Sequence, residues 1–206
     1  QTLGGILKMQ CEVDGRNREI EYLSRIESQM DRMSSMISEI LYENRCSPSD
    51  TKHILDMALA QISVEDYASN VHIDNEVPEL QVRVNSILFT RVLVNLIHNA
   101  ALAVDKEREL AIWIHVRARR VDDLPFITFS VSDNGCGMTE QQQATMWEQG
   151  ISGFGSSGLG LAFVKQTVEA MDGSVISESQ PGKGTRFIIF LPEVVNHGTK
   201  DYDTFH

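Results

Sequence analysis

Several features are scarce in this 206-residue sequence, and each scarcity excludes a class of protein. No apolar run approaches the roughly 18 residues that a membrane-spanning helix needs, and no signal peptide is recognisable. Lysine and arginine total 18 against 29 aspartates and glutamates, and the net charge of -11 disfavours DNA or RNA as a partner. The 3 cysteines form no CxxC pair, which favours reduced thiols and a cytoplasmic protein.

The apolar content is sufficient for one domain. Hydrophobic residues make up 42% of the chain, which allows one well-buried core and a small appendage. An acidic chain can still bind a nucleotide, provided that backbone amides and a metal ion meet the phosphates.

Residues 1–45 predict a helical hairpin that is separate from the rest of the chain. Its apolar residues recur at spacings of three and four, as in the seam of a bundle; they are Leu23, Ile26, Met30, Met33, Ile37 and Ile40. Asp14 and Gly15 offer the turn between the two helices. So thin a pair needs a partner surface, which is either a second copy, giving a homodimeric four-helix bundle, or the chain's own globular domain.

Residues 46–192 predict an α+β domain, a two-layer α/β sandwich in which helices cover one mixed sheet. Residues 45–49 are interpreted as a linker, because Pro48 stops a helix. The patterns predict helices over 51–62, 86–104 and 158–171, the last capped by Gly173, and strands over 71–74, 81–84, 111–117, 126–132, 174–178 and 185–191. Residues 193–206 predict a disordered polar tail.

Two asparagines lie on the most apolar of the predicted helices. Asn95 and Asn99 are four residues apart, so they share a helix face one turn from each other. An amide oxygen suits magnesium, and an amide NH2 group can donate to phosphate. Taken alone, the pattern fits two ordinary polar residues on a half-buried helix better.

Asp133 ends a predicted strand and is followed by Asn134, Gly135 and Gly137. Asn-Gly is a hairpin signal, but no second strand follows; residues 139–142 instead predict a capping box that opens a helix. A carboxylate at this place can accept a hydrogen bond from an adenine amino group, and the glycines would let the backbone approach the base.

Residues 153–161, GFGSSGLGL, match the pattern GxGxxG. A dinucleotide-binding fold requires a strand immediately before the first glycine, whereas residues 144–150 are polar and helix-like. The segment therefore predicts a glycine loop that runs into a helix N-terminus, an arrangement that suits anionic phosphates. The sequence contains no Walker lysine motif and no protein-kinase catalytic loop.

A fourth motif, residues 181–187, is by itself a glycine-rich turn between two strands. The order NxxxN, DxGxG, GxxGLGL and GxGTxF is far more specific than any one motif, and it resembles the ATP-binding domain of sensor histidine kinases. The resemblance covers about residues 48–192. It implies a Bergerat-type ATP-binding fold with ATP and magnesium as cofactors.

The resemblance also implies roles for individual residues. Asn95 and Asn99 would be catalytic, Asn99 would also hold magnesium, and Asp133 would read adenine. The nucleotide-binding set would further include Gly135, Gly137, Gly155, Gly158, Leu159, Gly160 and Thr185. Residues 139–157 would form the ATP lid, with Trp147 where the family often has phenylalanine. Leu102 stands where many members carry a basic residue, so Lys106 or Arg108 would have to substitute.

An activity and partners follow from the same resemblance. The γ-phosphoryl group of ATP would pass to a histidine of the dimeric hairpin and then to an aspartate in the receiver domain of a response regulator. Leu3 resembles the leucine that follows the phosphorylated histidine in the family, which would place that histidine just upstream of residue 1. His53, His72, His98 and His115 are then structural, and any membrane attachment would come through regions outside this sequence.

Two rival functions stay open. An ATPase of the related chaperone and topoisomerase branch would carry a catalytic glutamate where Asn95 stands, and asparagine cannot act as that base. A degenerate kinase that senses or scaffolds without catalysis would keep the same motifs, so only turnover separates it from an active kinase.

Overall fold

The protein is described by a computed structural model over residues 46–104, 109–148 and 160–195. The predicted hairpin of residues 1–45 and the tail beyond residue 195 lie outside the described residues. The elements are β1 (Ser47–Asp50), α3 (Thr51–Ile62), η1 (Ala68–Asn70), β2 (Val71–Asn75), β3 (Gln81–Val84), α4 (Ser86–Leu102), β4 (Ile112–Val121), β5 (Leu124–Asp133), α5 (Glu140–Thr145), α6 (Gly160–Glu169), β6 (Ser174–Gln180) and β7 (Gly184–Pro192).

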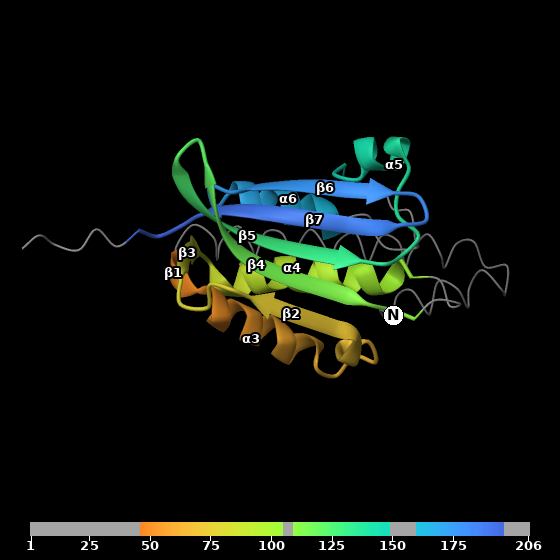
Figure 1. The fold of residues 1–206 in the computed structure, drawn as a ribbon, viewed down its shortest axis with the longest axis horizontal. Helices are drawn as coiled ribbons and strands as arrows, with labels where there is room; N and C mark the ends of the chain where they lie inside the picture. The colour runs from red at the N-terminus through yellow and green to blue at the C-terminus, as the bar shows by residue number, and fades with distance from the viewer. Residues whose placement is uncertain (1–45, 105–108, 149–159, 196–206) are drawn as a thin grey trace, which may run out of the picture.

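The domain is a mixed five-stranded sheet with helices on one side, as the sequence predicts. The strand order is β2-β4-β5-β7-β6, with β2 and β4 parallel and the other neighbours antiparallel. Figure 1 shows α4 and α6 together on one side of the sheet, with α3 beside α4. None of the helices within the described ranges is long and apolar enough to cross a membrane.

The core lies between the sheet and these helices. Alternate residues of the two central strands point into it, namely Ile112, Ile114, Val116, Ile127, Phe129 and Val131. Phe89 of α4 meets Phe129 edge to face, with ring centroids 5.0 Å apart. Such an aromatic pair contributes about 0.5–1.5 kcal/mol beyond the area that it buries. The pairing fixes α4 against β5, the strand that ends at Asp133.

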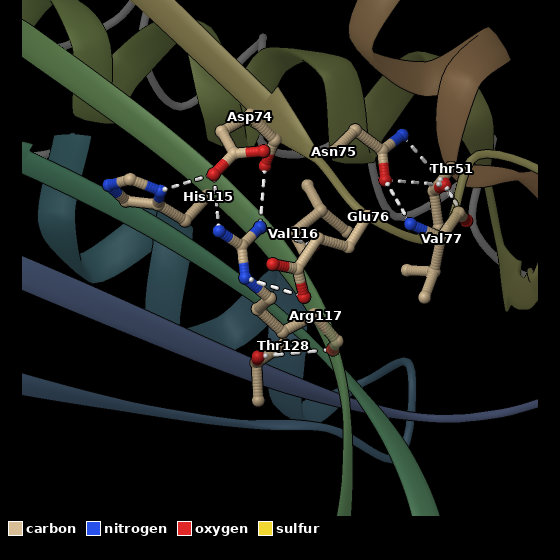
Figure 2. A network of polar contacts seen from close by, with 9 residues as sticks. All are labelled: Thr51, Asp74, Asn75, Glu76, Val77, His115, Val116, Arg117 and Thr128. Atoms are coloured by element: carbon tan, nitrogen blue, oxygen red, sulfur yellow. Dashed lines mark hydrogen bonds and ion pairs between the residues drawn. The ribbon is translucent and has the colours of Figure 1, made fainter.

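On the opposite face of the sheet, β2 and β4 carry a network of polar side chains (Figure 2). There Arg117 of β4 pairs with Asp74 of β2 and, through Nε, with Glu76 at 2.9 Å. His115 Nδ1 lies 3.6 Å from the same Asp74 carboxylate. The hydrogen bond from Arg117 lowers the pKa of Asp74 below its ordinary value. None of the predicted site residues belongs to this network; those that the structure describes lie elsewhere in the domain.

The interpretation of residues 45–49 as a linker is wrong. Residues 47–50 form β1, which pairs antiparallel with β3 and places Pro48 opposite Arg83. Proline is tolerated because this two-stranded sheet has only edge strands. The next residue, Thr51, donates to the carbonyl of Val77 at 2.6 Å, which ties the start of α3 to the loop after β2 (Figure 2).

The domain also extends beyond Pro192, where the tail was predicted to begin. Glu193 N donates to the Pro125 carbonyl at 3.1 Å, and Val194 N donates to the Gln81 carbonyl at 2.8 Å. These two bonds join the end of β7 to the β4–β5 hairpin and to β3. The rest of the predicted tail lies outside the described residues.

The cap of α6 differs from the prediction in one position. The left-handed residue after the helix is Asp172, with φ 56°, and not Gly173. Gly173 N donates to the Val168 carbonyl and Asp172 N to the Glu169 carbonyl, the two bonds of a Schellman motif. Gly173 is needed for space instead, because a Cβ there would lie 2.7 Å from the Phe190 carbonyl oxygen.

Candidate functional site

Asp133 is a buried carboxylate at the end of β5, with 8% of the residue exposed. Its Oδ1 accepts hydrogen bonds from Gly135 N at 2.8 Å and from Thr185 N at 3.2 Å. Its Oδ2 makes no hydrogen bond to any residue within the described ranges. Burial raises the pKa of Asp133 above its ordinary value, and the two backbone donors oppose that rise. One oxygen is thus fixed by the protein, while the other can accept from a ligand.

The glycines near Asp133 lie where segments of the chain touch each other. A Cβ on Gly135 would lie 2.5 Å from the Ala103 carbonyl oxygen, and one on Gly137 would lie 2.0 Å from the Gln180 carbonyl oxygen. On the other segment, a Cβ on Gly184 would lie 2.0 Å from the carbonyl oxygen of Asp133. The first and third glycine motifs therefore pack backbone against backbone around Asp133.

Helix α4 brings the predicted asparagines to the same region. Asn85 caps its start by accepting from Ile87 N and Leu88 N. At its end, the Ala103 carbonyl accepts from Cys136 N at 2.9 Å, so the helix terminus touches the first glycine motif. Asn99 precedes this contact by one turn, about 6 Å along the helix axis.

The side chains of Asn95 and Asn99 are half-buried, and neither makes a hydrogen bond with the described part of the chain. Arg91 lies one turn earlier on the same face of α4, and its guanidinium stacks over the ring of Phe163 at 4.9 Å. Because Phe163 is in the first turn of α6, this face of α4 points toward the start of α6. The second glycine motif leads into that helix start. Gly160 is described there, whereas Gly155, Gly158 and Leu159 lie outside the described residues.

The first part of the predicted lid is a short helix attached to the sheet. Its capping box is confirmed, because Thr139 and Gln142 exchange both of the expected hydrogen bonds. Trp147, where the family often has phenylalanine, packs edge to face on Phe187 of β7 with centroids 5.9 Å apart. The remainder of the predicted lid, residues 149–157, lies outside the described residues.

Two other predictions concern the ends of the site. Leu102 is 44% exposed at the end of α4, so the place where the resemblance expects a basic residue holds an apolar side chain. The two basic candidates, Lys106 and Arg108, lie outside the described residues. His98 contacts Tyr67 through a 3.4 Å hydrogen bond to Nδ1, which agrees with a structural role for that histidine.

Three residues of this region were not identified from the sequence. Arg91 is detectable in principle, because it precedes Asn95 by the same four residues that separate Asn95 from Asn99. Ser179 and Gln143 bond to the segment after Gly137, and no spacing in the sequence indicates this.

Comparison with known proteins agrees with this arrangement. Residues 84–195 match the family described as histidine kinase-, DNA gyrase B-, and HSP90-like ATPase, which is more than half of the chain. The alginate biosynthesis sensor protein KinB of Pseudomonas aeruginosa is 27% identical over 208 residues, covering 93% of this chain and 34% of KinB. The sensor histidine kinase ZraS of Klebsiella oxytoca is 38% identical over 112 residues, covering 54% of this chain and 23% of ZraS. The chain spans well under half the length of these relatives.

Solved structures show the same fold. A mycobacterial sensor histidine kinase, MprB, superposes with a TM-score of 0.58 at 26% identity, covering 72% of this chain and 98% of that one. Full-length ShkA in complex with AMPPNP superposes with a TM-score of 0.59 at 20% identity, covering 93% of this chain and 43% of that one. At the latter identity the likeness concerns the fold alone.

Proposed function

Because the chain belongs to the family of histidine kinase-, DNA gyrase B- and HSP90-like ATPases, we propose that it binds ATP with magnesium as the catalytic part of a sensor histidine kinase. In this proposal the γ-phosphoryl group passes to a histidine and then to an aspartate in the receiver domain of a response regulator. The chain would act as a homodimer through residues 1–45, on the cytoplasmic side of any membrane to which the whole protein is attached.

The observation that carries the proposal is the state of Asp133. Its Oδ1 is held by the backbone amides of Gly135 and Thr185, and its Oδ2 has no partner in the described part of the chain. An acceptor of this kind, on a residue that is otherwise mostly buried, fits the amino group of adenine, because the ligand donates to the one carboxylate oxygen that the described part of the chain leaves unpaired. The two bonds to Oδ1 keep the carboxylate in one orientation before the base arrives.

The donor set also fits a magnesium ion at the phosphate end. Asn99 offers a neutral amide oxygen on the face of α4 that points toward the start of α6. When bound, magnesium supplies charge neutralisation across the phosphates. Asn95 would orient the phosphates through its NH2 group, and the start of α6 would direct backbone amides at them. Positioning of this kind is the main contribution that a protein makes to phosphoryl transfer.

Asn95 favours transfer to a protein side chain over hydrolysis. A water-activating ATPase needs a base on this helix, and an amide cannot take a proton from water. The Nδ1 of the neighbouring His98 hydrogen-bonds to Tyr67 at 3.4 Å, which turns the ring toward the segment before β2. With an amide in place of that base, the site favours an acceptor that arrives with its own nucleophilic nitrogen, such as a histidine.

The test of base recognition compares ADP with GDP by calorimetric titration of the 206-residue chain. Guanine presents a carbonyl where adenine presents its amino group. The Asp133 carboxylate would then face a second hydrogen-bond acceptor, and no hydrogen bond could form. We expect ADP to bind about tenfold more tightly than GDP or better, the cost of an unpaired buried carboxylate. Asp133→Ala should narrow that difference. Similar affinities of the wild-type chain for ADP and GDP would refute the assignment of Asp133.

Phosphoryl transfer needs its own test, with a version of the chain extended upstream through the expected histidine. Incubated with γ-labelled ATP and magnesium, the extended version should acquire an acid-labile label, as phosphohistidine does. The 206-residue chain alone should acquire no stoichiometric label. An acid-labile label on an internal histidine of the shorter chain would contradict the expected acceptor, and failure of the extended version would favour a regulatory module.

A further inference from the structure

Ser179 of β6 uses the full hydrogen-bonding capacity of its hydroxyl group. Its Oγ accepts from Met138 N at 2.8 Å and lies 3.1 Å from the Gly184 carbonyl oxygen and 3.0 Å from Thr185 Oγ1. A serine hydroxyl has one donor and two acceptor sites. All three are satisfied together if Ser179 donates to Gly184 and accepts from both Met138 and Thr185. The hydroxyl then has nothing left to offer a ligand.

The partners of Ser179 belong to the two segments that surround Asp133. Met138 follows the first glycine motif directly, and Gly184 and Thr185 belong to the third. Thr185 N is one of the two donors that hold Asp133 Oδ1, at 3.2 Å. Ser179 therefore makes no hydrogen bond to the Asp133 carboxylate itself; Thr185, which bonds to both, links the two.

Gln143 of α5 strengthens the same junction. Its Nε2 donates to the Met138 carbonyl at 3.2 Å and to the Ser179 carbonyl at 3.1 Å. The two protons of the amide group are both used, so Gln143 links the start of the expected lid to the end of β6. The two side chains, Ser179 and Gln143, thus connect two parts of the chain that are distant in the sequence, residues 138–143 and residues 179–185.

We propose that Ser179 is a positioning residue for base recognition, which holds Thr185 and the segment after Gly137 in the geometry that orients Asp133. This inference rests on the proposed nucleotide site. It assigns to a residue outside the four sequence motifs a part in the choice between adenine and guanine.

The test measures the ratio of ADP to GDP affinity for the wild-type chain, Ser179→Ala and the matched control Ser177→Ala. Ser177 lies two residues earlier on the same strand and the same face, is also half-buried, and makes no hydrogen bond through its side chain to the described residues. We expect the ratio to fall roughly threefold to tenfold in Ser179→Ala, the range for one or two lost hydrogen bonds, and to stay unchanged in Ser177→Ala. If the alanine variant does not fold, Ser179→Cys decides in its place, because a thiol keeps the shape but bonds weakly.

The possible results distinguish a failure of the proposed nucleotide site from a failure of the role assigned to Ser179. A wild-type chain that binds ADP no better than GDP contradicts the proposed site itself, and the inference falls with it. A wild-type chain that discriminates, together with a Ser179→Ala variant that keeps the full ratio while its unfolding temperature falls, leaves the proposed function intact. That second result would make Ser179 merely structural and overturn the inference.

Discussion

Gly184 and Gly182 form a natural pair for testing how the site is built. Both have a positive φ, 94° and 79°, so alanine is strained at either position. Only Gly184 is also crowded: a Cβ there would lie 2.0 Å from the Asp133 carbonyl oxygen, whereas one on Gly182 would meet nothing within 4 Å. The left-handed backbone alone costs about 1–2 kcal/mol for alanine. Crowding against rigid backbone adds about 1–3 kcal/mol.

We therefore expect Gly182→Ala to lower the free energy of unfolding by about 1–2 kcal/mol and Gly184→Ala by about 2–5 kcal/mol. For a domain of this size the second change lowers the unfolding temperature by about 2–4 °C per kcal/mol. Urea unfolding followed by circular dichroism gives the first quantity and a thermal scan the second. Because the crowding falls on the backbone of Asp133, Gly184→Ala should also weaken ADP binding, and Gly182→Ala should not.

Equal destabilisation of the two variants, within about 0.5 kcal/mol, would show that crowding at Gly184 has no cost. A Gly184→Ala variant that folds and binds ADP as tightly as the wild-type chain would contradict the second expectation. In that case the contact between the two glycine motifs would not control the position of Asp133.

Two further predictions concern Asp133 and Asn99. Burial raises the pKa of Asp133, so its contribution to stability is fully present below the ordinary pKa and is lost as the pH rises through the folded value. As the pH rises from about 4 to about 8, the free energy of unfolding of Asp133→Asn, measured in urea, should therefore increase relative to that of the wild-type chain. The same variant should lose ADP binding. A difference in unfolding free energy that stays constant across this pH range would contradict the expectation. Asn99→Ala should weaken ATP binding only when magnesium is present and change stability by less than about 0.5 kcal/mol, because its side chain has no hydrogen bond within the described ranges; identical magnesium-dependent affinities would remove Asn99 from the metal site.

Most elements of the sheet and its helices were predictable because their apolar periodicity is strong. The strands at Val71–Asn75 and Gln81–Val84 and the helix at Thr51–Ile62 lie within one residue of the predicted ranges. In α4, Asn85 adds a capping side chain at the predicted start. Where burial alternates with the period of the element, the local sequence carries enough information to place it.

Two features of the fold could not be predicted, because they do not depend on a periodic pattern of apolar residues. Strand β1 is held by backbone bonds to β3, and its own side chains give no alternating pattern. The β4–β5 hairpin runs to Val121 and Leu124, well beyond the predicted strand ends. Its turn residues, Asp122 and Asp123, both have positive φ, as a type I′ turn requires. Two aspartates are a weaker turn signal than Asn-Gly, and the exposed residues before them hid the length of the strands.

The glycine motifs show most clearly where sequence reasoning stops. Their order indicated the family and the position of Asp133, but it did not indicate that the glycines also lie where one stretch of backbone contacts another. Gly137 and Gly184 are needed because the chain passes within contact of its own backbone 43 and 51 residues away, at Gln180 and Asp133 respectively (180 − 137 and 184 − 133). Ser179 and Thr185 complete that junction through bonds of similarly long range. Contacts of this separation leave no periodicity in the sequence, so a motif can reveal which residues matter before it reveals what they touch. In this domain the first and third glycine motifs meet at the carboxylate of Asp133. A substitution in the third motif that displaces Asp133, such as Gly184→Ala, is therefore expected to change base recognition.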